Sequence, residues 1–146
     1  MADIERTAQA VWTGDLKNGE GTVTTGSGVL REDAYSFGTR FASEEGTNPE
    51  ELLGAAHVGC YCMAFAHYLS GQGHRPERIE GRATCSLTPL EPEGFRLSKV
   101  RLEITGTVEG MDDDAFAKAA DEADDICVVS NALRGSVEIE IKARLA

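Results

Sequence analysis

The sequence predicts an α+β domain in which a largely antiparallel sheet wraps around one buried central helix. Nearly every residue between Leu52 and Leu69 is apolar or small, which is typical of a helix buried on all sides. Segments that alternate apolar and polar residues lie before and after this stretch, as expected for half-buried strands. The predicted order is β-β-β-α-β-β-α-β, and we expect residues 1–146 to form a single domain.

The region before the helix is predicted to contain three strands. Residues 7–13 and 22–25 pair as a hairpin across a glycine-containing turn. Gly26 and Gly28 predict a second turn, because neither the Lys-Ser/Thr pair nor the helix of a phosphate loop follows them. Residues 35–41 alternate again and predict the third strand.

The central helix begins at Asn48-Pro49, since proline is well accepted in a first helical turn. Glycines at its end and a following proline stop it near Gly73. A long hairpin, an acidic helix, a break at residues 127–130 and a last strand are expected after it. The predicted bounds are 78–87 and 95–108 for the hairpin, 112–126 for the helix and 136–145 for the strand.

Composition and charge exclude several classes of protein. The net charge of -11 argues against nucleic acid or an anionic membrane as a partner. The central helix is expected to be too short, and too interrupted by Gly and His, to span a membrane. The start, MADIERTAQA, has no basic segment followed by an apolar run, so we expect no signal peptide and a cytoplasmic protein. Its four cysteines are then reduced.

A reactive thiol in the central helix needs a cation from elsewhere in the fold. A cysteine attacks as the thiolate, whereas a free thiol with a pKa of about 8.5 is mostly protonated at neutral pH. Cys60 lies roughly 15 Å from the start of the helix, where the helix dipole has faded. No Lys or Arg occurs between Phe41 and His74. Arg40 is the best candidate, on the strand face opposite the aromatic residues; a solvated arginine on a sheet is the alternative.

The four cysteines have different predicted roles. Cys60 and Cys62 are about 200° apart around the helix, so they cannot form a disulfide without unwinding it. Cys62 and Cys85 are interpreted as core residues. Cys127 follows an acidic helix at a break in the chain, where a thiol can be exposed. It is a poor first nucleophile, but it can condense with an oxidised sulfur on Cys60.

Other kinds of site remain open. His57 and Cys60 are three residues apart and could contribute to a zinc site, although no CxxC pair occurs. Otherwise His57 and His67 are interpreted as helix-packing residues with a satisfied hydrogen bond. No GxSxG elbow supports a hydrolase. Four large apolar side chains could line a substrate pocket: Tyr61, Met63, Phe65 and Phe116.

Three segments of the chain resemble the OsmC branch of the OsmC/Ohr family: VWTGDLKNGEGTVTTGSGVL, FGTRFASEEGTNPEELLGAAHVGC and CVVSNALRG. The match runs in order from about Ala8 to Leu145, and TRF, GTNPEEL-GAAH-x-x-C and the distal C-x-V-S form a specific signature. The resemblance implies an OsmC-like fold and an intertwined homodimer in which sheets surround two central helices. Proteins of this family are thiol-dependent hydroperoxide reductases.

The resemblance also implies the roles of four residues. Cys60 matches the peroxidatic cysteine, Cys127 the resolving cysteine, and Arg40 and Glu50 the family's Arg and Glu. Cys60 would reduce an organic hydroperoxide, and more weakly hydrogen peroxide, and become a sulfenic acid. Cys127 would convert it to a disulfide, which a dithiol reductant of the lipoyl type would reduce, with no metal, haem or flavin cofactor. Val128 stands where the family commonly has proline, which affects how Cys127 is presented.

Helix geometry separates Glu50 from Cys60 by about 15 Å. We therefore expect either that the site is completed across the dimer or that Glu50 lies in a folded-back segment before the helix. The alternative function is a non-catalytic thiol redox sensor or small-ligand-binding protein on the same fold. A zinc-stabilised structural domain is the third possibility.

Overall fold

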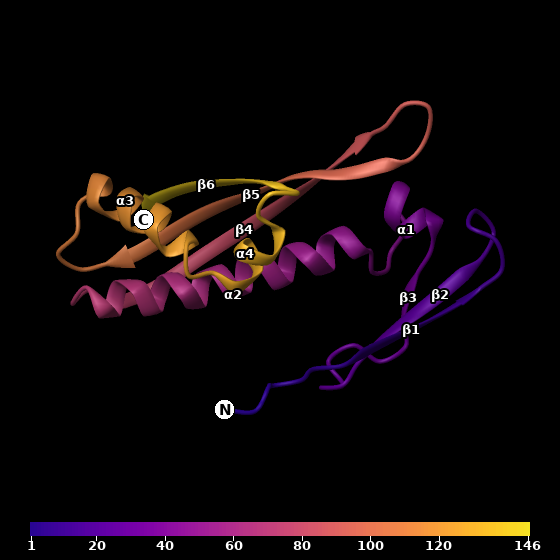
Figure 1. Cartoon of the computed structure of the whole chain (residues 1–146), viewed down its shortest axis with the longest axis horizontal. Helices are drawn as coiled ribbons and strands as arrows, with labels where there is room; N and C mark the ends of the chain where they lie inside the picture. The colour runs from indigo at the N-terminus through magenta and orange to yellow at the C-terminus, as the bar shows by residue number, and fades with distance from the viewer. The chain divides into compact units, whose positions relative to one another are not determined.

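The computed structural model describes all residues from Met1 to Ala146, and these form two compact units, Met1–Leu52 and Leu53–Ala146. Helices and strands make an α+β fold, as the sequence predicts. Two three-stranded sheets account for all the strands (Figure 1).

The N-terminal unit contains an antiparallel sheet with the order β1-β2-β3. β1 (Ala8–Thr13) and β2 (Glu20–Thr25) form the predicted hairpin, and β3 (Asp33–Tyr35) pairs with the other edge of β2. The turn predicted after β2 is also present. Gly28 has a φ of 76° there, a left-handed conformation that glycine adopts readily, and its N–H donates to the Thr25 carbonyl at 2.9 Å.

The predicted strand over residues 35–41 is wrong, because the chain leaves the sheet after Tyr35 and forms a short helix, α1 (Phe37–Phe41). Ser36 caps this helix. Its Oγ accepts a hydrogen bond from the Thr39 N–H at 3.2 Å, and Thr39 Oγ1 accepts one from the Ser36 N–H at 2.8 Å. The two phenylalanines of α1 are four residues apart, a spacing that fits one face of a strand or of a helix.

The central helix α2 (Pro49–Gly71) begins where the sequence predicts. The N–H of Glu51 donates to Asn48 Oδ1 at 2.8 Å, so Asn48 satisfies one of the free amides of the first turn. The buried residues of α2 recur every three or four positions and occupy one face: Gly54, His57, Tyr61, Phe65 and Leu69. Met63, on another face, is 77% exposed. The prediction of a helix buried on all sides is therefore wrong for a single chain.

α2 is also long and apolar enough, by length and composition, to cross a membrane. The prediction that this helix is too short to span a bilayer is therefore wrong. Core helices of other proteins meet the same criterion, and one face of α2 packs in a protein core. Length and composition alone do not assign α2 to a membrane.

The C-terminal unit contains the second sheet, in the order β4-β5-β6. β4 (Pro76–Pro89) and β5 (Phe95–Val108) form the predicted long hairpin, whereas β6 (Glu138–Leu145) runs parallel to β5. The last sheet is thus mixed. α3 (Asp113–Asp124) contacts β6, and α4 (Val128–Leu133) lies beside α2 (Figure 1).

The core of the C-terminal unit is formed mainly by α2, β5 and α3. The Phe65 ring lies 5.8 Å from the Tyr61 ring and 5.0 Å from the Phe116 ring, and all three side chains are fully buried. The Tyr61 hydroxyl donates to the Ala120 carbonyl at 2.6 Å, and burial raises the pKa of this phenol. These aromatic residues fill the core, so the expectation that they line a substrate pocket with the exposed Met63 is wrong.

Candidate active site

The N-terminal unit brings Arg40 and Glu50 together. Arg40 is in the last turn of α1, and Glu50 is in the first turn of α2. Arg40 Nη2 donates to Glu50 Oε1 at 2.7 Å, and Arg40 Nε lies 3.1 and 3.2 Å from the two carboxylate oxygens. Such a forked contact fixes the plane of the guanidinium as well as its position.

Asn48 joins the two helices that carry this ion pair. Its side-chain amide donates to the Thr39 carbonyl of α1 at 3.5 Å, while its Oδ1 caps α2. Asn48 and Thr39 are both buried. The sequence predicts Asn48 only as the start of a helix. The hydrogen bond from Asn48 to the Thr39 carbonyl could not be predicted, because residues 35–41 were expected to form a strand and not the helix α1.

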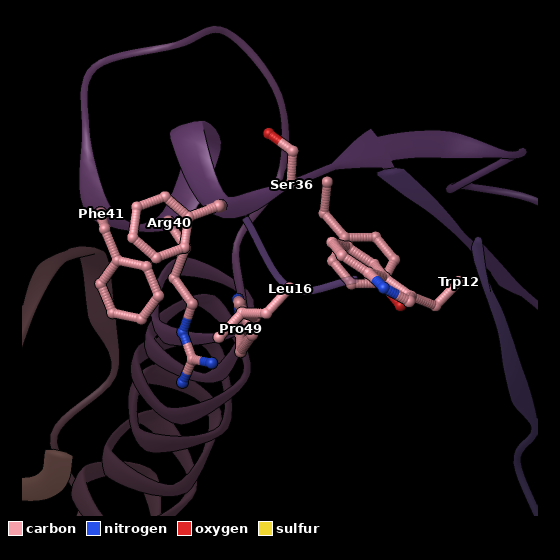
Figure 2. Close-up of a pocket in the computed structure, with 8 residues that line it drawn as sticks. Trp12, Leu16, Ser36, Arg40, Phe41 and Pro49 are labelled. Atoms are coloured by element: carbon pink, nitrogen blue, oxygen red, sulfur yellow. The ribbon is translucent and has the colours of Figure 1, made fainter. Parts of the chain in front are cut away.

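Arg40 also lines an apolar pocket of about 330 Å³ in the same unit. The Arg40 Cζ atom lies 5.2 Å from the centre of the Phe41 ring, and Figure 2 shows the guanidinium extending past this ring and Pro49. The pocket is lined by Trp12, Leu16, Tyr35, Ser36, Phe37, Arg40, Phe41 and Pro49. An apolar hollow with one cation suits a ligand that has an apolar body and a polar end. Apart from Arg40, the sequence did not indicate these lining residues as a site.

Glu50 is the second residue of α2, so the hypothesis that it lies in a folded-back segment before the helix is wrong. Cys60 follows ten residues later on the same continuous helix, which corresponds to about 15 Å along the axis. The other hypothesis, a site completed across a homodimer, stays a prediction.

The C-terminal unit places Cys60 and Cys127 in one core. Cys127 is fully buried, and Cys60 is half-buried and packs against the core cluster that contains Cys127. The chain does break at Cys127, between α3 and α4, but the predicted exposure of its thiol is wrong, because this N-cap residue of α4 packs inside the core. The helix α4 also replaces the irregular segment that was expected over residues 127–130. The Sγ atom of Cys127 accepts a hydrogen bond from the Ser130 N–H at 3.5 Å.

The other two cysteines are packing residues, as predicted. α2 approaches β4 closely at Gly81, where a Cβ atom would lie 2.4 Å from Val58 Cγ2 and 3.1 Å from Cys62 Sγ. Glycine leaves room there for the Val58 and Cys62 side chains of α2 to pack against β4. Burial raises the pKa of the Cys62 thiol, which keeps it protonated and unreactive. Cys85, on β4, packs against the same core.

His57 contributes to this core through a hydrogen bond to Ser130. The distance from His57 Nε2 to Ser130 Oγ is 2.7 Å, and both side chains are fully buried. Burial lowers the pKa of His57 more than the nearby Asp124 raises it, so the imidazole is neutral at neutral pH. No group of three or more His, Cys, Asp or Glu side chains could hold a metal ion, so the zinc alternative lacks a ligand set.

Comparisons with known proteins agree with the sequence signature. A family described as OsmC-like protein matches residues 42–142. Peroxiredoxin OsmC of Escherichia coli (strain K12) is 40% identical over 141 residues, which cover 97% of this chain and 98% of the relative. Among solved structures, an organic hydroperoxide resistance protein from Elizabethkingia anophelis is similar over the whole of both chains, with a TM-score of 0.76 and 25% identity.

A second solved structure shows the same fold. The organic hydroperoxide resistance protein OhrB of Bacillus subtilis matches with a TM-score of 0.75 and 25% identity, over 94% of this chain and 98% of the relative. The family match covers more than half of the chain, and the Escherichia coli relative matches nearly all of it. The chain therefore belongs to the OsmC-like protein family, as its sequence signature predicts.

Proposed function

We propose that this chain is a cysteine-based peroxidase that reduces organic hydroperoxides to alcohols and acts more weakly on hydrogen peroxide. The observation that carries the proposal is the arrangement of two free thiols in one core, with Cys60 half-buried and Cys127 enclosed. A peroxide can reach only the first of them. The 40% identity to a peroxiredoxin over nearly the full chain supports the same chemistry.

The reaction begins at Cys60. Its thiolate attacks the distal oxygen of the hydroperoxide and the O–O bond breaks, so Cys60 becomes a sulfenic acid and an alkoxide leaves. The alkoxide takes up a proton from water, equivalent to the one that the Cys60 thiol released when it ionised, and becomes the alcohol. The sulfur of Cys127 then attacks the sulfur of Cys60, the S–O bond breaks, and water leaves with the proton that Cys127 gives up. A dithiol of the lipoyl type reduces the resulting disulfide through two exchange steps.

Arg40 supplies the cation that stabilises the Cys60 thiolate, and Glu50 orients its guanidinium through the forked contact. The apolar pocket beside Arg40 favours an organic hydroperoxide over hydrogen peroxide, because it takes up an alkyl or aryl group. The active form is a homodimer in which the Arg40–Glu50 pair of one subunit serves Cys60 of its partner. The proposed location is the cytoplasm, a reducing compartment in which a dithiol can return both cysteines to thiols between turnovers.

The proposal is tested by following the consumption of cumene hydroperoxide and of hydrogen peroxide in the presence of a dithiol. The proteins compared are the wild type and the Cys60→Ser, Cys127→Ser and Cys62→Ser variants. We expect Cys60→Ser to lose at least about a thousandfold in rate, because it removes the nucleophile. Cys127→Ser is expected to stop after the sulfenic acid. Cys62→Ser, which changes a packing thiol, is the matched control and keeps its activity within about twofold.

Full activity in Cys60→Ser would contradict the proposed chemistry. A wild type that forms the Cys60–Cys127 disulfide once but does not turn over with any dithiol would support the redox sensor instead. A wild type that consumes hydrogen peroxide faster than cumene hydroperoxide would contradict the role given to the apolar pocket.

A further inference from the structure

A single side-chain hydrogen bond connects α4 to α2. It joins His57 Nε2 to Ser130 Oγ at 2.7 Å, and both side chains are fully buried. α3, in contrast, is bonded to α2 twice, through the hydroxyls of Tyr61 and Tyr68. Loss of the His57–Ser130 bond would therefore leave α4 with no side-chain hydrogen bond to α2. Loss of either tyrosine bond would leave α3 with the other one.

Each end of this bond is next to one of the proposed redox cysteines. His57 precedes Cys60 by three residues on α2, a spacing that puts both side chains on the same side of the helix. The Ser130 N–H donates to Cys127 Sγ at 3.5 Å. Ser130 thus contacts α2 through its hydroxyl and Cys127 through its backbone, and α4 lies beside α2 (Figure 1).

Packing alone does not explain a histidine at this position. His57 Nδ1 is buried and has no hydrogen-bond partner, which costs free energy that an apolar side chain of similar size would not cost. Another side-chain bond of α4, from Asn131 Nδ2 to the Asp125 carbonyl at 3.0 Å, ties this helix to the end of α3 and not to α2. Val128 does not restrict φ as a proline would, and its side chain is 73% exposed.

We propose that His57 and Ser130 are positioning residues for the formation of the Cys60–Cys127 disulfide; this inference rests on the proposed function. In that step the Cys127 sulfur must reach the sulfenic sulfur of Cys60 with the narrow geometry of a disulfide, as water leaves. The His57–Ser130 bond fixes the first turn of α4 against the turn of α2 that carries Cys60. It acts on this second step and not on the attack of Cys60 on the peroxide.

The test separates the two steps in a single turnover. Reduced protein is mixed with one equivalent of cumene hydroperoxide, quenched with an alkylating reagent at successive times, and analysed by mass spectrometry for sulfenic acid and disulfide. The main variant is the double variant His57→Leu/Ser130→Ala, which removes both partners and leaves neither unpaired. We expect the attack on peroxide to change by less than about twofold and disulfide formation to slow by about tenfold, the effect of losing one buried hydrogen bond.

Two further variants test whether the effect comes from the hydrogen bond. His57→Gln can place an amide nitrogen near the position of Nε2, so it is expected to recover most of the rate of disulfide formation. His67→Leu changes an exposed histidine of the same helix and is expected to behave as the wild type. Thermal unfolding shows whether the double variant folds. If it does not, Ser130→Ala, a smaller change, is used to compare the rate of attack on the peroxide with the rate of disulfide formation.

A second measurement needs no peroxide. Equilibration with reduced and oxidised glutathione measures how readily Cys60 and Cys127 form a disulfide, expressed as the effective concentration of one thiol at the other. We expect this effective concentration to fall about tenfold in the double variant. Wild-type values for both disulfide measurements in the double variant would overturn the inference and leave the peroxidase intact. Equal slowing of both steps would also overturn it. Absence of peroxide-driven disulfide in the wild type would overturn the proposed function, while the glutathione measurement would still decide the role of His57 and Ser130.

Discussion

The ion pair between Arg40 and Glu50 orients the guanidinium and contributes little to the stability of the fold. The Arg40 side chain is 37% exposed and that of Glu50 16%, so water screens their attraction. A pair of this kind contributes at most about 1 kcal/mol to stability. The fork nevertheless fixes the orientation of a guanidinium that would otherwise rotate, which is the property a thiolate partner requires.

The Glu50→Gln substitution separates these two effects. We expect the free energy of unfolding, measured in urea, to change by less than about 1 kcal/mol. The attack of Cys60 on cumene hydroperoxide should slow by about tenfold to a hundredfold, because an amide cannot hold Arg40 with two charge-assisted bonds. Glu51→Gln, at the adjacent exposed residue, is the control. Equal rates in the two variants would show that Glu50 does not act through Arg40.

The sequence could predict the candidate site residues but not their surroundings. The motifs that resemble the family have a fixed order and spacing, and they contain Arg40, Glu50, Cys60 and Cys127. They can be recognised even where the secondary structure predicted for them is wrong, as it was for Arg40. The burial of Cys127 could not be predicted, because it depends on how α4 packs in three dimensions and two acidic residues, Asp124 and Asp125, come shortly before it in the sequence. The role of Asn48 was hidden for the same reason, since it bonds to α1.

The short helix α1 is the element that presents Arg40. It has five residues, and a helix of this length is not stable by itself in water. Its first turn depends on the reciprocal bonds between Ser36 and Thr39, and its Thr39 carbonyl accepts a hydrogen bond from Asn48. The N-cap therefore determines whether α1 holds Arg40 in place.

Removal of this cap by Ser36→Ala should cost about 1 kcal/mol of stability. Because Ser36 also lines the pocket, the sharper readout is local: hydrogen exchange at the Thr39 and Arg40 amides should become faster, while exchange in β4 and β5 stays unchanged. Ser36→Asp keeps a capping oxygen and is expected to restore slow exchange. Ser43→Ala, in the exposed loop after α1, is the control, and an equal effect there would contradict the importance of the cap.

Among the elements, those with a clear period were predictable and the short ones were not. Alternation over many residues identified both hairpins, and a long apolar run identified α2. α4 has six residues and carries too little periodic signal to be distinguished from a loop. The parallel pairing of β6 with β5 was also not predictable, because the order of strands along the chain does not specify which of them are neighbours in a sheet.

At the scale of the whole molecule, one face of α2 is not covered by the chain. Besides Met63, this face carries exposed small residues, including Ala55, Ala56 and Gly59. The apolar sequence of α2 predicts that every face of the helix is buried, whereas a single chain buries only one face. Small side chains on the open side allow a second helix to approach closely, as the proposed homodimer requires.

The Met63→Lys substitution tests the homodimer. We expect the wild type to sediment as a dimer and Met63→Lys to shift toward the monomer by at least about tenfold in dissociation constant, because a charge at the centre of an apolar interface must be desolvated. Val29→Lys introduces the same charge at an exposed apolar residue outside α2 and serves as the control. A monomeric wild type at micromolar concentration would contradict the dimer.

Under the proposed function, the enclosure of Cys127 also determines which of the two cysteines an external thiol can attack. In this structure solvent reaches Cys60 but not Cys127, so an external thiol has access to only one of the two sulfurs. Under the proposed function, an incoming reductant is therefore expected to form its mixed disulfide on Cys60, with Cys127 as the leaving thiol. Oxidant and reductant would then react with Cys60 in turn, and Cys127 would exchange electrons only with Cys60.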